Sequence, residues 1–130
     1  MKRIFALTLC VLTVFTVLCS CKKEEPLADS AKIYYSYNTE ALTVEAGDIL
    51  DELLYMFASM ETELNEDAVI DISSSFNVTF YLDGSPVAVF YVDEDLVFSD
   101  GSHNCYMLKD GNYFDYGRLC DIYTELSEAK

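Results

Sequence analysis

The spacing of apolar and polar positions changes several times along the chain, and each change marks a predicted element. Residues 4–18 form one apolar run without charge. Residues 32–38 (KIYYSYN) are rich in aromatic side chains, which suits a first strand. From Asp48 the apolar residues recur every three or four positions, which predicts an amphipathic helix capped by Asp48, with Asp51 in capping-box position. The apolar stripe of this helix consists of Ile49, Leu50, Leu53, Leu54, Phe57, Met60 and Leu64.

From residue 69 onward the apolar spacing changes to two, which is the period of a β-strand. The residues expected on one face of this strand are Ile70, Ile72, Phe76, Val78, Phe80 and Leu82. Asp83 and Gly84 then predict a two-residue type I′ hairpin turn, because that turn needs positive φ at both central positions. A loop of this length would place Phe80 opposite Val87 in the hairpin.

The C-terminal part predicts more strands and a second helix. The return strand, residues 87–92 (VAVFYV), is apolar on both faces and is therefore expected at the centre of the sheet. Residues 96–108 form a second predicted hairpin. A final helix over about residues 115–128 is expected to bury one apolar stripe. That stripe consists of Leu119, Ile122, Tyr123 and Leu126.

These elements define the expected fold class. Two amphipathic helices must bury their stripes, and the apolar face of the sheet is the available surface. The sequence therefore predicts a two-layer α+β domain. Its antiparallel meander sheet would have about four to five strands, with the two amphipathic helices packed on one face.

The N-terminus has the features of an export signal. A basic head (MKR) precedes the apolar run, which is shorter than the roughly 20 residues that span a bilayer. The next residues, Leu18, Cys19, Ser20 and Cys21, resemble the lipobox of bacterial lipoproteins. The resemblance implies cleavage between Ser20 and Cys21 by a type II signal peptidase, with diacylglycerol and an N-acyl chain such as palmitate on Cys21. Cys19 fits less well, because Leu18 would occupy the position that requires a small residue.

The lipid anchor determines the expected domain organisation and location. Each buried methylene contributes about 0.8 kcal/mol, so two or three acyl chains hold firmly where one binds marginally. Residues 1–20 are then the signal peptide, residues 21–31 the lipidated cysteine and a tether, and residues 32–130 a single α+β domain. The Lys-Lys-Glu-Glu run after the cysteine resembles export signals of Bacteroidetes surface lipoproteins. It implies a cell-envelope protein in the outer membrane, facing either the periplasm or the medium.

The charge of the exported part restricts its partners. All 23 acidic residues of the chain lie beyond residue 20, and few basic residues oppose them there. Such a surface repels nucleic acid and anionic lipid headgroups, which argues against a nucleic-acid partner. It suits a basic protein or peptide, and a glycan partner stays open. It also favours solubility outside the cell.

Candidate catalytic chemistry is sparse in the sequence. His103, the one histidine of the chain, lies two residues before Cys105 on a predicted strand. Neighbours at this spacing share a face but rarely reach the geometry of a nucleophile–base pair. We therefore predict no catalytic residue, no metal site and no cofactor. Cys105 and Cys120 could form a disulfide in an oxidising compartment or remain as two buried thiols.

Tyrosine is the remaining notable feature, with ten copies and no tryptophan. Tyr34, Tyr35 and Tyr37 form one group, and Tyr113 and Tyr116 belong to another. Tyrosine is favoured at binding surfaces, although the same residues would also fill the seam between helices and sheet. The sequence thus predicts a membrane-anchored, non-catalytic binding module of the cell envelope. The alternatives are an inhibitor of a basic hydrolase such as lysozyme, or a small envelope enzyme that uses His103 or an acid pair.

Overall fold

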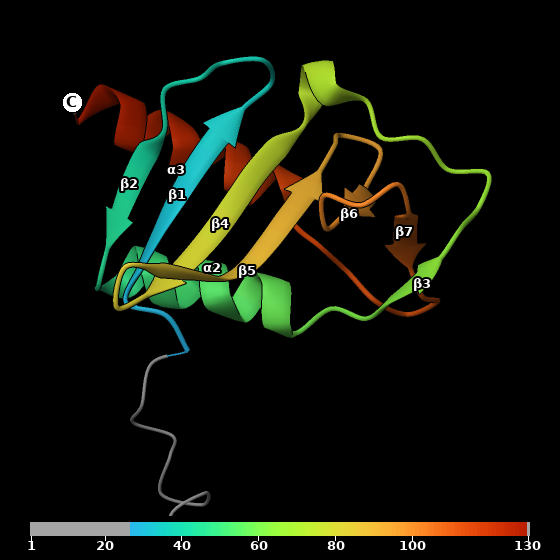
Figure 1. Ribbon diagram of the computed structural model, residues 1–130, viewed down its shortest axis with the longest axis horizontal. Coiled ribbons are helices and arrows are strands. Elements are labelled where there is room, and N and C mark those ends of the chain that lie inside the picture. Colours follow the sequence, from blue (N-terminus) through green and yellow to red (C-terminus); the bar gives the residue numbers. More distant parts are fainter. Residues whose placement is uncertain (1–26, 130) are drawn as a thin grey trace, which may run out of the picture.

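Residues 27–129 of the computed structural model are described here, and they form one antiparallel sheet and two helices (Figure 1). The signal peptide, the cleavage site after Ser20 and the lipid site at Cys21 lie outside the described residues. In chain order the elements are β1 (Ser30–Tyr35), β2 (Leu42–Glu45), α2 (Asp48–Ala58), β3 (Thr62–Leu64), the 3-10 turn η2 (Ile72–Ser74), β4 (Phe76–Leu82), β5 (Ser85–Val92), β6 (Val97–Ser99), β7 (Cys105–Leu108) and α3 (Tyr116–Glu128). No helix within the described range is long and apolar enough to cross a membrane.

The sheet has seven strands in the order β2-β1-β4-β5-β6-β7-β3, and every pairing between neighbours is antiparallel. The predicted α+β class and the meander from β4 to β7 are confirmed, and β5 is the central strand. The predicted count of four to five strands was too low. The two additional strands, β2 and β3, are short and form the two edges.

Both helices pack on the same face of the sheet (Figure 1). The core between the two layers takes side chains from both helices and from the central strands. Its largest fully buried members are Phe76, Phe80, Ile33, Leu50, Leu53, Leu119, Ile122, Val78 and Val92. The ring of Phe57 on α2 packs on that of Phe90 on β5, with 4.6 Å between the ring centroids. The opposite face of the sheet is left without a covering layer in the described part of the chain.

The first helix is shorter than its apolar stripe predicted. It ends at Ala58, and Leu64 instead lies on β3, where it pairs with Tyr106 of β7. Strand pairing at the sheet edge satisfies the backbone of residues 62–64, so this segment does not continue the helix. The expected cap was also wrong, because Gly47 is the N-cap and Asp48 is already helical. Asp48 and Asp51 still lie in the first turn, where they oppose the positive end of the helix dipole.

Two strand boundaries also differ from the prediction. The first strand covers Ser30–Tyr35, because Ser36 turns the chain with φ of 57°. Ordered structure begins before residue 32, since Ala28 is fully buried and the N–H of Asp29 donates to the carbonyl of Tyr81 at 2.8 Å. The fourth strand begins only at Phe76, because a 3-10 turn covers Ile72–Ser74.

The β4–β5 hairpin combines a confirmed turn with an unexpected register. Asp83 and Gly84 have φ of 54° and 81°, as a type I′ turn requires. Beyond the turn, however, Phe80 pairs with Ala88 rather than with Val87, because a β-bulge shifts the register between Phe80 and Tyr81. Val87 is the extra residue and is 51% exposed. The bulge reverses the expected orientation of β5, because a shift by one residue moves each side chain to the other face.

Candidate functional site

The open face of the sheet carries a row of polar and aromatic side chains across its centre. Ile33, Val78 and other buried residues of β1 and β4 point toward the helices, so the residues between them point the other way. Tyr34 of β1 pairs directly with Asn77 of β4, and Asn77 pairs with Tyr91 of β5. Neighbouring strands lie about 4.8 Å apart, so one asparagine separates two tyrosines over about 10 Å.

This row forms the floor and sides of a shallow groove of about 420 Å³, which we call the tyrosine groove. It is lined by Tyr34, Ser36, Asn38, Thr39, Asn77 and Tyr91. Its volume lies within the range of about 300–1,000 Å³ that is usual for small-molecule sites. None of the lining side chains carries a formal charge, although the chain as a whole has a net charge of −15.

The loop between β1 and β2 closes one end of the groove, and its shape is fixed by Asn38. The N–H of Asn38 donates to the carbonyl of Tyr35 at 3.1 Å, and the side-chain oxygen of Asn38 accepts from the N–H of Glu40 at 3.0 Å. A backbone donor can only be met by the amide oxygen, so the amide NH₂ of Asn38 is the group left for a ligand.

The floor residue Asn77 is arranged in a similar way. Its side-chain oxygen accepts from the hydroxyl of Thr79 at 2.8 Å. No buried side-chain nitrogen or oxygen of residues 27–129 lacks a hydrogen-bond partner, so the NH₂ of Asn77 is accessible rather than trapped in the sheet. Both asparagines can therefore donate into the groove while their oxygens hold the protein in place.

Tyr91 is supported from the side by the loop between β6 and β7. A Cβ atom at Gly101, whose φ is 95°, would contact Cε2 of Tyr91 at 3.6 Å. The same loop is held by Asp100, which accepts from the N–H of Ser102 at 2.9 Å. Hydrogen bonds from Ser102, first from its side chain and then from its backbone, hold the pKa of Asp100 below the ordinary value of 3.8. The aromatic wall of the groove thus rests on an ordered loop.

The structure separates the tyrosines that the sequence grouped. Tyr34 lines the groove, and Tyr37 is 74% exposed in the adjoining loop. Tyr35 instead packs on Phe76, with 4.7 Å between their ring centroids. Tyr113 is also 74% exposed but is not part of the groove lining.

Tyr116 at the start of α3 has a packing role. Its hydroxyl donates to the carbonyl of Ser74 at 2.5 Å, and its ring lies 5.5 Å from that of Phe76. Burial is the main reason that the pKa of Tyr116 is raised above its ordinary value of 10.0. Tyr35 and Tyr116 thus fill the seam between helices and sheet, which was the structural alternative to a binding surface.

The groups considered for catalysis lie apart from the groove. His103 is exposed in the β6–β7 loop and not on a strand, because β7 begins at Cys105. The predicted sharing of one strand face by His103 and Cys105 was therefore wrong. Among residues 27–129, no three His, Cys, Asp or Glu side chains come together in a way that could hold a metal ion.

The two cysteines of the domain are both free thiols and belong to different layers. Cys105 lies on β7 of the sheet, whereas Cys120 lies on α3. Cys120 packs against the core, and burial is the largest influence that raises the pKa of its thiol. Of the two arrangements that the sequence left open, the structure has the unbridged one.

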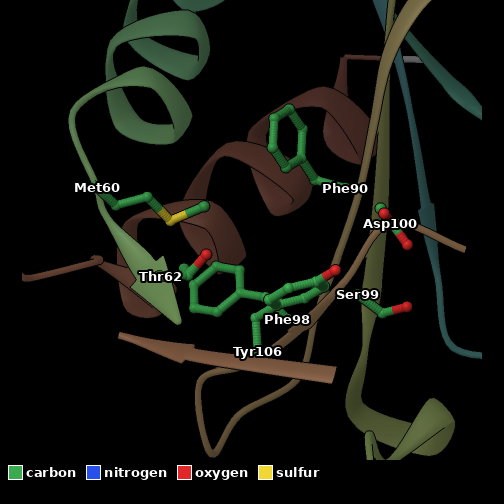
Figure 2. Close-up of a pocket in the computed structure, with 7 residues that line it drawn as sticks. All are labelled: Met60, Thr62, Phe90, Phe98, Ser99, Asp100 and Tyr106. Atoms are coloured by element: carbon green, nitrogen blue, oxygen red, sulfur yellow. The ribbon is translucent and has the colours of Figure 1, made fainter. Parts of the chain in front are cut away.

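A second pocket of about 140 Å³ lies on the helix side of the sheet, beyond the end of α2 (Figure 2). It is lined by Met60, Thr62, Phe90, Phe98, Ser99, Asp100 and Tyr106. Met60 and the aromatic side chains of Phe90, Phe98 and Tyr106 are among the residues drawn around it (Figure 2). The volume is well below that of usual ligand sites. We interpret it as a gap in the packing where the helix layer ends before the sheet does.

Sequence reasoning missed Asn77 and Tyr91, the two central residues of the groove. The register expected for the hairpin would have paired Asn77 with Phe90 and turned Tyr91 toward the core. The bulge at Val87 alone reverses this register, and nothing in the alternation of residues 87–92 predicts the bulge.

Comparisons of this chain with protein-family models, with curated proteins and with solved structures gave no match.

Proposed function

We propose that this protein is a lipid-anchored, non-catalytic binding module of the cell envelope, and that the tyrosine groove is its binding surface. The lipid on Cys21, the cleavage after Ser20 and the outer-membrane location rest on the resemblance of the N-terminus to bacterial lipoproteins. The binding role rests on the groove, which combines a suitable volume with aromatic walls and accessible amide donors.

The position of the groove relative to the N-terminus is the observation that carries the proposal. The described chain enters the domain where β1 begins, and the β1–β2 loop beside the groove lies at the other end of that strand (Figure 1). A strand of six residues spans about 20 Å at roughly 3.3 Å per residue. A tether from Cys21 would then hold one end of the sheet near the membrane and leave the groove at the far end.

Binding rather than catalysis is favoured by what surrounds the groove. Its lining contains no acid, histidine or cysteine that could act as a base or a nucleophile. The lining of the smaller pocket does not include His103 either.

The anchor is tested by substitution at the two candidate cysteines. Cys21→Ser should abolish incorporation of labelled palmitate and release the protein from the membrane fraction, whereas Cys19→Ser should leave both unchanged. Retention of the lipid in Cys21→Ser would contradict the proposed site of attachment.

The binding surface is tested separately, with the labelled protein added to isolated cell envelopes. A Tyr34→Ala/Tyr91→Ala double variant should lose saturable binding, whereas Tyr113→Ala, which removes an exposed tyrosine outside the groove, should retain it. Equal binding by both variants would show that the groove is not the surface used.

A further inference from the structure

The chemistry of the groove lining restricts the ligand more narrowly than the charge of the chain does. A cationic partner would need carboxylates in the groove, and an anionic partner would need a lysine or arginine there, but the lining has neither. Lys32, a basic residue of the same sheet face, lies over the ring of Tyr81 at 5.5 Å from its centroid. Although the protein is strongly acidic, the groove is therefore suited to an uncharged ligand.

The two tyrosines and the asparagine between them suit a ring with an apolar face and a polar edge. Tyr34 and Tyr91 offer aromatic surface on either side of Asn77, together with phenolic hydroxyls that both donate and accept. The amides of Asn38 and Asn77 add donors, and Ser36 supplies a hydroxyl that does both. A sugar ring has C–H groups on its faces and hydroxyl groups around its edge, and so requires this combination.

From this lining we infer that the tyrosine groove binds an uncharged saccharide. The inference rests on the proposed binding function and names its ligand class. The sugar ring packs on Tyr91 and Tyr34, and its hydroxyls bond with the amides of Asn77 and Asn38. The position of the groove at the far end of β1 from the point where the chain enters leaves it open to glycan chains that approach from beyond the membrane surface (Figure 1).

The test uses the full processed chain in a detergent without a sugar headgroup, titrated with uncharged oligosaccharides of glucose, galactose, mannose, xylose and N-acetylglucosamine. Isothermal titration calorimetry should show saturable binding to at least one of them. Tyr91→Ala should weaken that binding by about tenfold or more, because it removes the stacking surface. Tyr91→Phe should retain most of the affinity, and Tyr113→Ala should match the unchanged protein.

Two further titrations use an oligolysine peptide and an acidic oligosaccharide, and circular dichroism confirms that each variant is folded. If no uncharged oligosaccharide binds but the peptide binds in a way that Tyr91→Ala abolishes, the saccharide inference is overturned while the proposed binding function stands. Saccharide binding that is unchanged in both Tyr91→Ala and Tyr34→Ala would overturn the assignment to the groove. The absence of any saturable, groove-dependent ligand would overturn both.

Discussion

The buried carboxylate of Asp93 accepts a hydrogen bond from the backbone N–H of Asp71, at 2.8 Å and across 22 residues of sequence. The other oxygen of Asp93 accepts from the N–H of Val97 at 2.9 Å and from that of Asp95 at 3.0 Å. Asp93 is only 1% exposed. One acid thus fixes the β5–β6 turn and fastens to it the loop that precedes β4. The run of three acids at residues 93–95 therefore contains a structural residue as well as a charged turn.

Replacement of Asp93 by Asn should destabilise the domain by about 3 kcal/mol, because an NH₂ group would face backbone donors that then lack an acceptor. The control is Asp95→Asn, which removes an exposed charge from the same turn and should change the free energy of unfolding by no more than about 0.5 kcal/mol. Urea denaturation measures both values. Equal stability of the two variants would show that the hydrogen bonds of Asp93 are dispensable.

The ion pair between Glu52 of α2 and Arg118 of α3 should make stability depend on pH. Arg118 donates through Nε and Nη2 to the two carboxylate oxygens of Glu52, at 2.5 Å and 2.8 Å. These bonds are the main reason that the pKa of Glu52 lies below its ordinary value of 4.5. The stabilisation is therefore complete above pH 4.5 and is lost as the pH falls through the lower pKa of the folded state.

Glu52→Gln should accordingly be less stable than the unchanged protein at neutral pH, and the difference should shrink as the solution is acidified below pH 4.5. Thermal unfolding at a series of pH values measures this difference. Glu63→Gln is the control, because Glu63 is exposed on β3 and its substitution should change the free energy of unfolding at neutral pH by no more than about 0.5 kcal/mol. A constant difference between Glu52→Gln and the unchanged protein at all pH values would contradict the role of the pair.

Both cysteines of the domain should be alkylated without prior reduction. Burial raises the pKa of the Cys120 thiol, and the thiolate is the reactive form, so Cys120 should react more slowly in the folded than in the unfolded chain. Mass spectrometry of the peptides that contain Cys105 and Cys120 measures each rate. Recovery of a peptide pair joined by these two residues would instead establish the disulfide that the sequence left open.

The hairpin turn at Gly84 should tolerate a side chain poorly. Its φ is 81°, where an L-residue is strained, although a Cβ would have no atom within 4 Å. Gly84→Ala should therefore cost about 1 kcal/mol through backbone strain alone. Gly117→Ala, within α3, should be neutral or stabilising by up to about 1 kcal/mol, since helices favour alanine. Chemical denaturation of the two variants compares them directly, and a Gly84→Ala variant as stable as the unchanged protein would show that the turn tolerates a side chain at this φ.

The fold class could be predicted from the sequence because helices and strands differ in the spacing of their apolar residues. The stripe at Leu50, Leu53 and Phe57 and the alternation at Phe76, Val78 and Phe80 both define buried faces in the structure. The edge strands could not be found in this way. β2 has four residues, which are too few for a clear alternation, and β3 has three and is formed through pairing with β7, which is distant in sequence.

The candidate site was harder to predict, because it depends on which residues become cross-strand neighbours. Grouping tyrosines by their closeness in sequence joined Tyr34 to Tyr35, although alternation sends these two to opposite faces. Asn77 and Tyr91 come together only across a hairpin whose register is shifted by the bulge. Tyr37 and Tyr113 are exposed, as a binding role would require, but only Tyr37 lies in the β1–β2 loop beside the tyrosine groove.

The extra residue at Val87 affects how the tyrosine groove responds to deletion of a residue beside the β4–β5 turn. The return strand VAVFYV is apolar on both sides, so either of its faces could be buried. With all its residues in a regular two-residue hairpin, Tyr91 would face the core. The bulge takes up Val87, so that Ala88 pairs with Phe80 and Tyr91 pairs with Asn77. Loss of Val87 would restore a regular hairpin with the same pairs beyond the turn, so this groove can lose one residue beside the turn while Tyr91 stays on the open face.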